Sequence, residues 1–215
     1  MKKMLFVLSL VLLCSNTSFS QKAIKLLKPQ TNGGKPLMQV LNNRKSSRVF
    51  SKKKLPPQML SNLLWAAFGV NRPLKKVKAG KRTAPSAFNW QEIDIYVALA
   101  EGLYLYDAKA NILKPVLAKD IRAASGRQKF TQIAPVNLIF VANLAKMRKA
   151  DKKSKDFYSA IDTGFISQNV YLFCASENLS TVVLGYVDRA VLRKKMALKA
   201  DQKIIVTQPV GFPGK

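Results

Sequence analysis

The stretch RTAPSAFNWQEIDIYVALAEGLYLYD, residues 82–107, carries the clearest structural pattern in the chain. It begins with a loop of small residues at 84–87. Over 93–97 apolar residues alternate with polar ones, which predicts a strand. A turn at 101–102 leads into a second predicted strand over 103–106. The stretch therefore predicts an antiparallel hairpin that directly follows a small-residue loop.

The rest of the sequence adds strands and helices around this hairpin. A third strand is expected over 111–117, at a sheet edge because Pro115 has no N–H to donate to a neighbour. The continuous apolar run 136–142 predicts a strand that is buried on both faces. Two more strands are expected over 181–186 and 203–210. Helices are expected over 36–43, 56–69, 119–125, 157–178 and 188–196, and a basic loop over 71–83.

These elements predict an α+β fold in which helices flank a central mixed or antiparallel sheet. The chain of 215 residues is long enough for one domain with a sizeable core, placed over residues 37–215. The helix over 157–178 is apolar nearly all round, which places it in the centre of a core or of an interface. Residues 21–36 carry little pattern and are expected to form a flexible lead-in.

The first 20 residues are interpreted as a cleavable signal peptide. A short basic start precedes the apolar run 5–13, which is too short to span a bilayer. Small residues within 18–20 favour cleavage before Gln21, so the mature protein is expected to be exported, either periplasmic or secreted. An N-terminal core helix is one alternative. A lipoprotein anchored at Cys14 is another, although Leu13 stands where its processing needs a small residue.

The residue types exclude several kinds of catalytic site. The chain has no histidine, which rules out Ser-His-Asp triads, Cys-His dyads and His-ligated metal sites. Only Cys174 remains after signal cleavage, so no intrachain disulfide can form, and its apolar surroundings predict that it packs as a small hydrophobe. No catalytic side chain and no metal site are predicted, and any enzymatic chemistry is expected to come from a cofactor.

The charge is strongly positive, with 37 Lys and Arg against 11 Asp and Glu, formally +26. Such a surface attracts nucleic acid, anionic lipid and envelope polymers in a general way. The cations are scattered along the chain, and no zinc-finger spacing, RNA-binding signature or glycine-rich phosphate loop accompanies them. A solvated basic surface is therefore favoured over specific nucleic-acid binding.

One basic motif has a spacing that suits an anionic ligand. Arg44 and Arg48 lie four residues apart, so a helical or turn-like backbone would place both guanidinium groups on one side. Ser46 lies between them and can donate a hydroxyl hydrogen bond. Two guanidinium groups and a hydroxyl suit an anion that is bound through several oxygens. The alternative is the solvated basic end of a helix.

The order of three motifs resembles the FMN-dependent nitroreductase family. Arg44-x-Ser46-x-Arg48 follows the first helix, Pro85-Ser86-Ala87-x-Asn89-x-Gln91 follows the second, and a strand that contains Gly185 follows the long helix. The stretch 82–107 is most similar to the branch that contains the azoline oxidases of peptide maturation. The resemblance covers roughly residues 38–213 and rests on the order and spacing of the motifs together.

The resemblance implies an FMN site at the interface of an intertwined homodimer. Its cofactor-binding residues would be Arg44, Ser46, Arg48, Pro85, Ser86, Ala87, Asn89, Gln128, Leu184, Gly185 and Lys215. The arginines and the serine would contact the phosphate, the ribityl chain and the pyrimidine edge. The small-residue loop, from the partner subunit, would let backbone approach the flat ring, with an amide from Asn89, while Trp90 and Gln91 tie the loop to the sheet.

The remaining positions carry weaker expectations. Gln128 would reach the flavin with a polar side chain, and a backbone amide of Leu184-Gly185 would face flavin N5. Lys215, with Arg82 as a further candidate, would bind the phosphate where many relatives have additional basic residues. Ordinary loop and strand packing is the alternative for Gln128, Leu184 and Gly185.

The implied reaction is a ping-pong transfer of hydride or electrons from NAD(P)H or another donor to a small-molecule acceptor. Many nitroreductases of the family carry an acidic residue where Leu184 stands, so a typical NAD(P)H-driven nitroreductase is less expected. The alternative function is a flavin-free relative whose basic surface binds anionic envelope polymers or nucleic acid.

Overall fold

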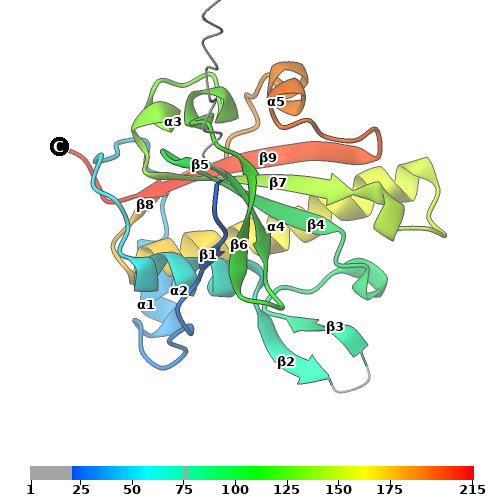
Figure 1. The fold of residues 1–215 in the computed structure, drawn as a ribbon. Helices are drawn as coiled ribbons and strands as arrows, with labels where there is room; N and C mark the ends of the chain where they lie inside the picture. The colour runs from blue at the N-terminus through cyan, green and yellow to red at the C-terminus, as the bar shows by residue number, and fades with distance from the viewer. Residues whose placement is uncertain (1–20, 75–76) are drawn as a thin grey trace, which may run out of the picture.

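The computed structural model describes residues 21–74 and 77–215 (Figure 1). The predicted signal peptide, residues 1–20, lies outside the described residues. The strands are β1 (Ile24–Lys25), β2 (Val70–Leu74), β3 (Val77–Arg82), β4 (Ile93–Leu99), β5 (Gly102–Asp107), β6 (Ile112–Leu117), β7 (Val136–Asn143), β8 (Ser180–Thr181) and β9 (Gln202–Gly211). The α-helices are α1 (Leu37–Asn43), α2 (Pro57–Phe68), α3 (Phe130–Ile133), α4 (Lys152–Ser176) and α5 (Arg189–Lys195). Short 3₁₀ turns lie at Ala87–Asn89, Arg122–Ser125 and Leu144–Lys146.

A seven-stranded sheet forms the centre of the molecule, in the order β1-β6-β5-β4-β7-β9-β8. Every neighbouring pair in it is antiparallel, so the structure selects the second of the two predicted sheet types. The predicted hairpin is β4–β5, with Leu99 paired to Gly102 at its turn. The expected α+β fold with helices flanking a sheet is confirmed.

Each face of the sheet has its own hydrophobic core. Alternation along β7 directs Leu138 and Phe140 to the face covered by α2 and α4, and Ile139 and Val141 to the face of α3 and α5. Figure 1 shows α4 along one side of the sheet and α5 on the other. All four side chains are fully buried, which confirms the prediction that this run is buried on both faces.

The long helix α4 is less uniform than its composition predicts. It begins at Lys152, where Asp151 accepts a hydrogen bond from the Ser154 N–H at 2.7 Å. Its buried face mixes polar residues, such as Asp162 and Thr163, with apolar ones. Its other face exposes a stripe of three apolar side chains four residues apart, which are Phe157, Ile161 and Phe165. The expectation of a helix that is apolar nearly all round is therefore wrong for the buried face. The exposed apolar stripe is typical of a surface that contacts a partner.

The structure corrects three local expectations. Most of the expected basic loop 71–83 forms the β2–β3 hairpin, with Val70 paired to Arg82. The strand expected over 181–186 is reduced to β8 and a single bridge between Leu184 and Thr207. The helix expected over 119–125 is a 3₁₀ turn at Arg122–Ser125.

The lead-in 21–36 also contains regular structure. It contributes β1, which pairs with Ile112 and Leu113 of β6, and buries Leu26. Because β1 is only two residues long, Pro115 further along β6 pairs with no described strand on that side, as expected for an edge position. Other local predictions are confirmed: Asp188 caps α5 by accepting from the Val191 N–H, and Cys174 is buried. None of the described helices is long and apolar enough to cross a bilayer.

Truncation of the central strand should lower stability strongly. Leu138→Ala truncates a fully buried side chain and leaves a cavity that the surrounding sheet cannot fill. The free energy of unfolding should therefore fall by about 2–5 kcal/mol. The same change at Leu37, 61% exposed in α1, should cost less than about 1 kcal/mol. Urea denaturation of both variants checks the burial pattern, and equal losses would contradict it.

Candidate functional site

Tyr171 of α4 organises the first part of the candidate site. Its hydroxyl lies 2.9 Å from the Ser46 Oγ and accepts a hydrogen bond from the Val183 N–H at 2.9 Å. The Arg44 guanidinium lies 5.4 Å from the centre of the Tyr171 ring, within cation–π distance. Arg44, Ser46, Tyr171 and Val183 form what we call the Tyr171 cluster. It joins the predicted Arg-x-Ser-x-Arg motif to the segment that leads to Gly185.

The backbone after α1 is extended rather than helical. Arg44 has φ −60° and ψ 122°, and the Ser47 N–H donates to the Thr181 carbonyl of β8 at 2.9 Å. The helical or turn-like backbone expected for Arg44 and Arg48 is therefore wrong. An extended chain directs every second side chain to one side, so Arg44, Ser46 and Arg48 can share a side without a helix.

The segment Leu184-Gly185 offers one free backbone donor. The Leu184 N–H donates to the Thr207 carbonyl at 2.8 Å and its side chain is buried, so neither faces a ligand. The Gly185 N–H has no acceptor among the described residues, and its carbonyl accepts from Val187 and Arg189. A Cβ built on Gly185 would meet nothing within 4 Å, which shows open space beside this peptide. Of the two predicted positions, Gly185 is the one that can donate to a ligand.

Gln128 lies beside this segment. Its Oε1 is buried and has no hydrogen-bond partner among the described residues. A Cβ built on Gly126 would lie 3.0 Å from this oxygen and 2.8 Å from the Leu184 Cδ1, so the two side chains meet over Gly126. A buried carbonyl oxygen without a donor is costly, and a ligand N–H would satisfy it.

Residues 84–91, which we call the Asn89 loop, form the second part of the site. Phe88, Asn89 and Gln91 have φ angles of 50°, 55° and 48°, a conformation that is uncommon for residues other than glycine. The Ala87 N–H donates to the Asp162 Oδ2 at 2.9 Å, and the Gln91 N–H donates to the Ser86 Oγ at 3.0 Å. These contacts hold a strained backbone in one arrangement, as is common at functional sites.

Gln91 ties the Asn89 loop to the β2–β3 hairpin, whereas the resemblance implied a tie to the main sheet. Its side chain donates to the Gly80 carbonyl at 2.9 Å and to the Asn89 Oδ1 at 3.1 Å, and accepts from the Arg82 Nε at 2.8 Å. The Asn89 oxygen therefore already accepts one hydrogen bond within the chain, and its NH₂ group is available to a ligand. Arg82 donates to Gln91 and to the Phe68 carbonyl, which uses two of its N–H groups.

The two parts of the site do not meet within one chain. Asp162, which holds the Asn89 loop, and Tyr171 are nine residues apart on α4, which is about 14 Å along the axis and about half a turn around it. The C-terminus lies with the first part, because the Gly214 N–H donates to the Val49 carbonyl next to Arg48. The structure therefore groups Lys215 with the arginine motif. It leaves Pro85, Ser86, Ala87 and Asn89 apart from them.

Three residues of this site were not predicted from the sequence. Tyr171 looks like one more aromatic residue of a core helix, and its partners are distant in sequence. Asp162 lies in the same apolar pattern, where a buried carboxylate is a signal in itself. Glu92 directly follows the Asn89 loop and is fully buried, and its oxygens have no hydrogen-bond partner among the described residues.

Glu92 and Asp162 form a buried carboxyl pair behind the Asn89 loop. Burial raises the pKa of Glu92 to about 7, and the neighbouring Asp162 carboxyl adds to this rise. Burial also raises the pKa of Asp162, against the hydrogen bond from the Ala87 N–H, which lowers it. Lys146 opposes the rise at Glu92 only weakly. Between the ordinary glutamate pKa of 4.5 and about pH 7, the buried pair therefore keeps a proton that an exposed pair would release.

The donor set of the site fits FMN. Cations at Arg44, Arg48 and Lys215 suit its phosphate, and the Gly185 N–H suits a ring nitrogen that accepts a hydrogen bond. The orphaned Gln128 oxygen suits the one N–H group of the oxidised ring. Within the described residues, no three acidic or cysteine side chains come close enough together to hold a metal ion.

Comparisons with known proteins agree on one family. Residues 41–212 match the family model described as "Nitroreductase family". A nitroreductase homologue of Methanocaldococcus jannaschii is 30% identical over 186 residues, covering 81% of this chain and 90% of its own. The crystal structure of a nitroreductase homologue from Ralstonia eutropha is 42% identical, with a TM-score of 0.85 over 91% of each chain.

Two more distant structures share the fold. A nitroreductase homologue from Desulfovibrio desulfuricans, solved in complex with FMN, is 20% identical, with a TM-score of 0.60 over 85% of this chain and 89% of its own. A chain of the Escherichia coli microcin synthetase McbBCD complex is 19% identical, with a TM-score of 0.67 over 98% of this chain and 85% of its own. The expected likeness to both nitroreductases and azoline-forming enzymes is confirmed at the level of the fold.

Replacement of the buried carboxyl should change how stability depends on pH. Folded Glu92 keeps its proton up to about pH 7, whereas in the unfolded chain it releases the proton near the ordinary glutamate pKa of 4.5. The wild-type protein therefore loses this contribution as pH rises from about 4.5 to about 7. Glu92→Gln cannot lose a proton, so it should exceed wild type at pH 8 by on the order of 2 kcal/mol and match it near pH 4.5.

Urea denaturation at a series of pH values measures this difference. Asp201→Asn removes an exposed carboxylate and serves as the matched control. A difference between Glu92→Gln and wild type that is constant with pH would show that folding does not shift the pKa of Glu92.

Proposed function

The chain belongs to the nitroreductase family, and we propose that it is an FMN-dependent oxidoreductase whose site is completed by a second copy of the chain. The observation that carries the proposal is a set of polar groups without a hydrogen-bond partner among the described residues, in segments next to the Tyr171 cluster. Arg44 and Arg48 supply cations, Gly185 supplies a free N–H, and Gln128 supplies a buried oxygen without a donor.

The residues of the chain would bind and orient the cofactor. Arg44 and Arg48 can each donate two parallel hydrogen bonds to phosphate or carbonyl oxygens, with Lys215 as an additional charge. Tyr171 holds Ser46 in place, because its hydroxyl is fixed by the Val183 N–H. When bound, FMN supplies reversible acceptance of hydride or electrons, so that a donor and then an acceptor use the site in turn.

The second copy would bring the Asn89 loop to the Tyr171 cluster. Phe88 is 79% exposed, and the stripe of Phe157, Ile161 and Phe165 on α4 is exposed as well. Large apolar side chains gathered on one surface favour association with a partner. A symmetric dimer would cover this surface twice and form two equivalent sites.

The proposal also covers the location of the enzyme and the source of its electrons. With the first 20 residues as a signal peptide, the enzyme would work outside the cytoplasm, where NAD(P)H is not the ordinary reductant. A quinol, a redox protein or an oxidisable substrate would then reduce the site. The side chain of Leu184 is apolar and buried where many NAD(P)H-driven relatives carry an acid, which is consistent with another donor.

The first experiment is the absorbance spectrum of purified protein 21–215 before and after addition of FMN. Flavin bands that co-elute with a dimer support the proposal. A colourless protein that ignores FMN overturns it. The alternative, a flavin-free binding protein with a basic surface, then becomes the leading function, because the net charge of +26 favours polyanions.

Loss of either arginine should weaken FMN binding. Arg44→Ala and Arg48→Ala each remove a charged hydrogen bond, which should raise the Kd by roughly tenfold to a hundredfold, or about 1.5–3 kcal/mol. Lys45→Ala, an exposed cation within the same motif, is the control and should change the Kd by less than about threefold, as expected for a screened surface charge. Fluorescence titration of FMN measures all three, and unchanged affinity at both arginines would contradict their assignment.

A mixed dimer tests whether two chains share each site. One chain carries Arg44→Ala with Arg48→Ala, and the other carries Asn89→Ala. If each site takes its arginines from one chain and its loop from the other, the mixed dimer keeps one intact site and one doubly altered site. We expect half the wild-type content of tightly bound FMN and half the turnover. A dimer with two impaired sites and no intact one would show that each chain forms its own site.

A further inference from the structure

A cavity of about 810 Å³ lies away from the candidate site, between β1, the start of α2, the β4–β5 turn and the segment around α3. This α2–α3 cavity is lined by none of the eleven predicted cofactor-binding residues. Its apolar lining residues are Ile24, Leu26, Leu27, Leu55, Pro57, Leu60, Leu99, Ile133, Pro135 and Val136. Its volume and its mostly apolar walls are typical of small-molecule sites.

The walls of the α2–α3 cavity are fixed by hydrogen bonds in the folded chain. The Leu26 N–H donates to the Asn111 carbonyl at 3.1 Å, and the Asn111 side chain donates to the Leu27 carbonyl at 3.0 Å. On the α2 side, Ser61 donates to the Leu27 carbonyl and Gln58 donates to the Lys28 carbonyl. Because both walls are held, a ligand would enter a formed cavity and need not first open the core.

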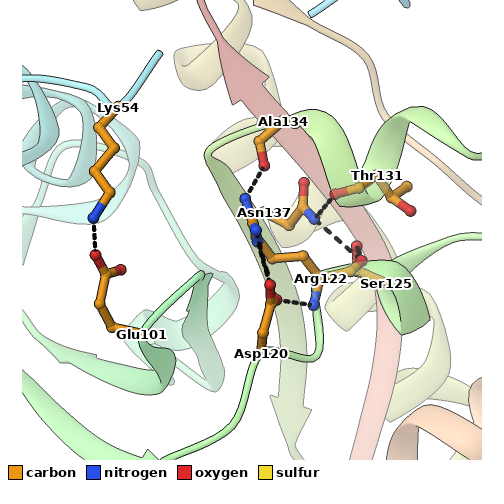
Figure 2. A network of polar contacts seen from close by, with 8 residues as sticks. All are labelled: Lys54, Glu101, Asp120, Arg122, Ser125, Thr131, Ala134 and Asn137. Atoms are coloured by element: carbon orange, nitrogen blue, oxygen red, sulfur yellow. Dashed lines mark hydrogen bonds and ion pairs between the residues drawn. The ribbon is translucent and has the colours of Figure 1, made fainter. Parts of the chain in front are cut away.

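Cations dominate the polar groups of the cavity. Lys25, Lys52, Lys54 and Arg122 line it, against one acidic residue, Glu101. Figure 2 shows Lys54 and Glu101 reaching toward one another, and the two form an ion pair that cancels the acidic charge.

Arg122 is anchored by its own contacts. It donates to the Asp120 carboxylate at 2.8 Å and to the Ala134 carbonyl at 3.1 Å (Figure 2). Lys25 and Lys52 form no ion pair within the part of the chain that the structure describes. Two cations are thus left for a negative ligand.

We propose that the α2–α3 cavity binds a single-chain amphiphilic anion, of which a long-chain carboxylate is the simplest example. The apolar chain lies against Leu26, Leu60 and Ile133, and the head group lies toward Lys52 and Lys25. Apolar walls alone would bind an uncharged apolar molecule, whereas the two lysines without ion-pair partners in the described part of the chain favour a negatively charged head group. This site is independent of FMN, so the proposal stands apart from the proposed function.

Calorimetric titration of protein 21–215 with dodecanoate, decanoate and dodecanol tests the proposal. Dodecanoate should bind one to one. Each buried methylene contributes roughly a fourfold gain in affinity, so decanoate, which is two methylenes shorter, should bind about fifteenfold more weakly. Dodecanol, which has the chain without the charge, should bind several-fold more weakly than dodecanoate. The affinities should be the same with and without saturating FMN.

Substitutions then locate the ligand. Leu60→Trp fills the cavity and should weaken dodecanoate binding at least tenfold, and Ile133→Trp on the opposite wall repeats the test at a partly exposed position that tolerates a larger side chain. Lys52→Glu should weaken binding at least fivefold. Lys149→Glu, the same charge reversal on an exposed lysine outside the cavity, should change it less than twofold.

Four results would overturn the proposal. One is the absence of dodecanoate binding. Another is equal weakening by Lys52→Glu and Lys149→Glu, which would show general attraction of anions to a basic surface. The third is binding that neither tryptophan variant weakens. Binding to anionic phospholipid vesicles that persists in both tryptophan variants would likewise assign the effect to the surface rather than to the cavity.

Discussion

Both parts of the candidate site depend on the rigidity of one helix, α4. Asp162 holds the Ala87 N–H of the Asn89 loop, and Tyr171 holds Ser46 and Val183. A helix fixes the separation and the angle of two such residues, here about half a turn apart and about 14 Å along the axis. The same helix packs against β9 and α2, so it cannot turn without loss of core contacts. This fixed spacing is the reason why the proposed function needs a second copy of the chain.

Local sequence patterns correctly predicted those helices and strands whose structure is determined by nearby residues. The run 136–142 is apolar at every position except Asn137, and a strand between two packed faces is the arrangement that buries all of it. The hairpin over residues 93–106 follows from alternation and one glycine turn, and Asp188 caps α5 through a residue three positions away. The motif residues could be predicted because the order of the motifs along the chain can be read without knowing any contact. Their grouping in space, however, came from the resemblance rather than from the pattern.

Long-range contacts explain what the sequence could not predict. Ser46 and Tyr171 are 125 residues apart, and no pattern near either residue indicates the other. The β2–β3 hairpin was missed because its lysines are typical of a solvated loop, whereas backbone pairing does not depend on side-chain polarity. The amide expected from Leu184-Gly185 can come only from Gly185, because the Leu184 N–H donates to Thr207, a residue of the last strand. The Glu92–Asp162 pair arises only when α4 is laid against the start of β4.

The strained backbone of the Asn89 loop has a consequence for how this protein behaves on dilution. Phe88 occupies the left-handed region at a cost of roughly 1–2 kcal/mol, yet its ring remains 79% exposed and contacts mainly Trp90 and Tyr158. A single chain thus gains little apolar burial to offset the strain. A partner that covers the ring would stabilise this conformation by mass action, so the order of the loop would increase with protein concentration while the sheet remained folded. The order of the Asn89 loop would then indicate whether the two subunits are associated.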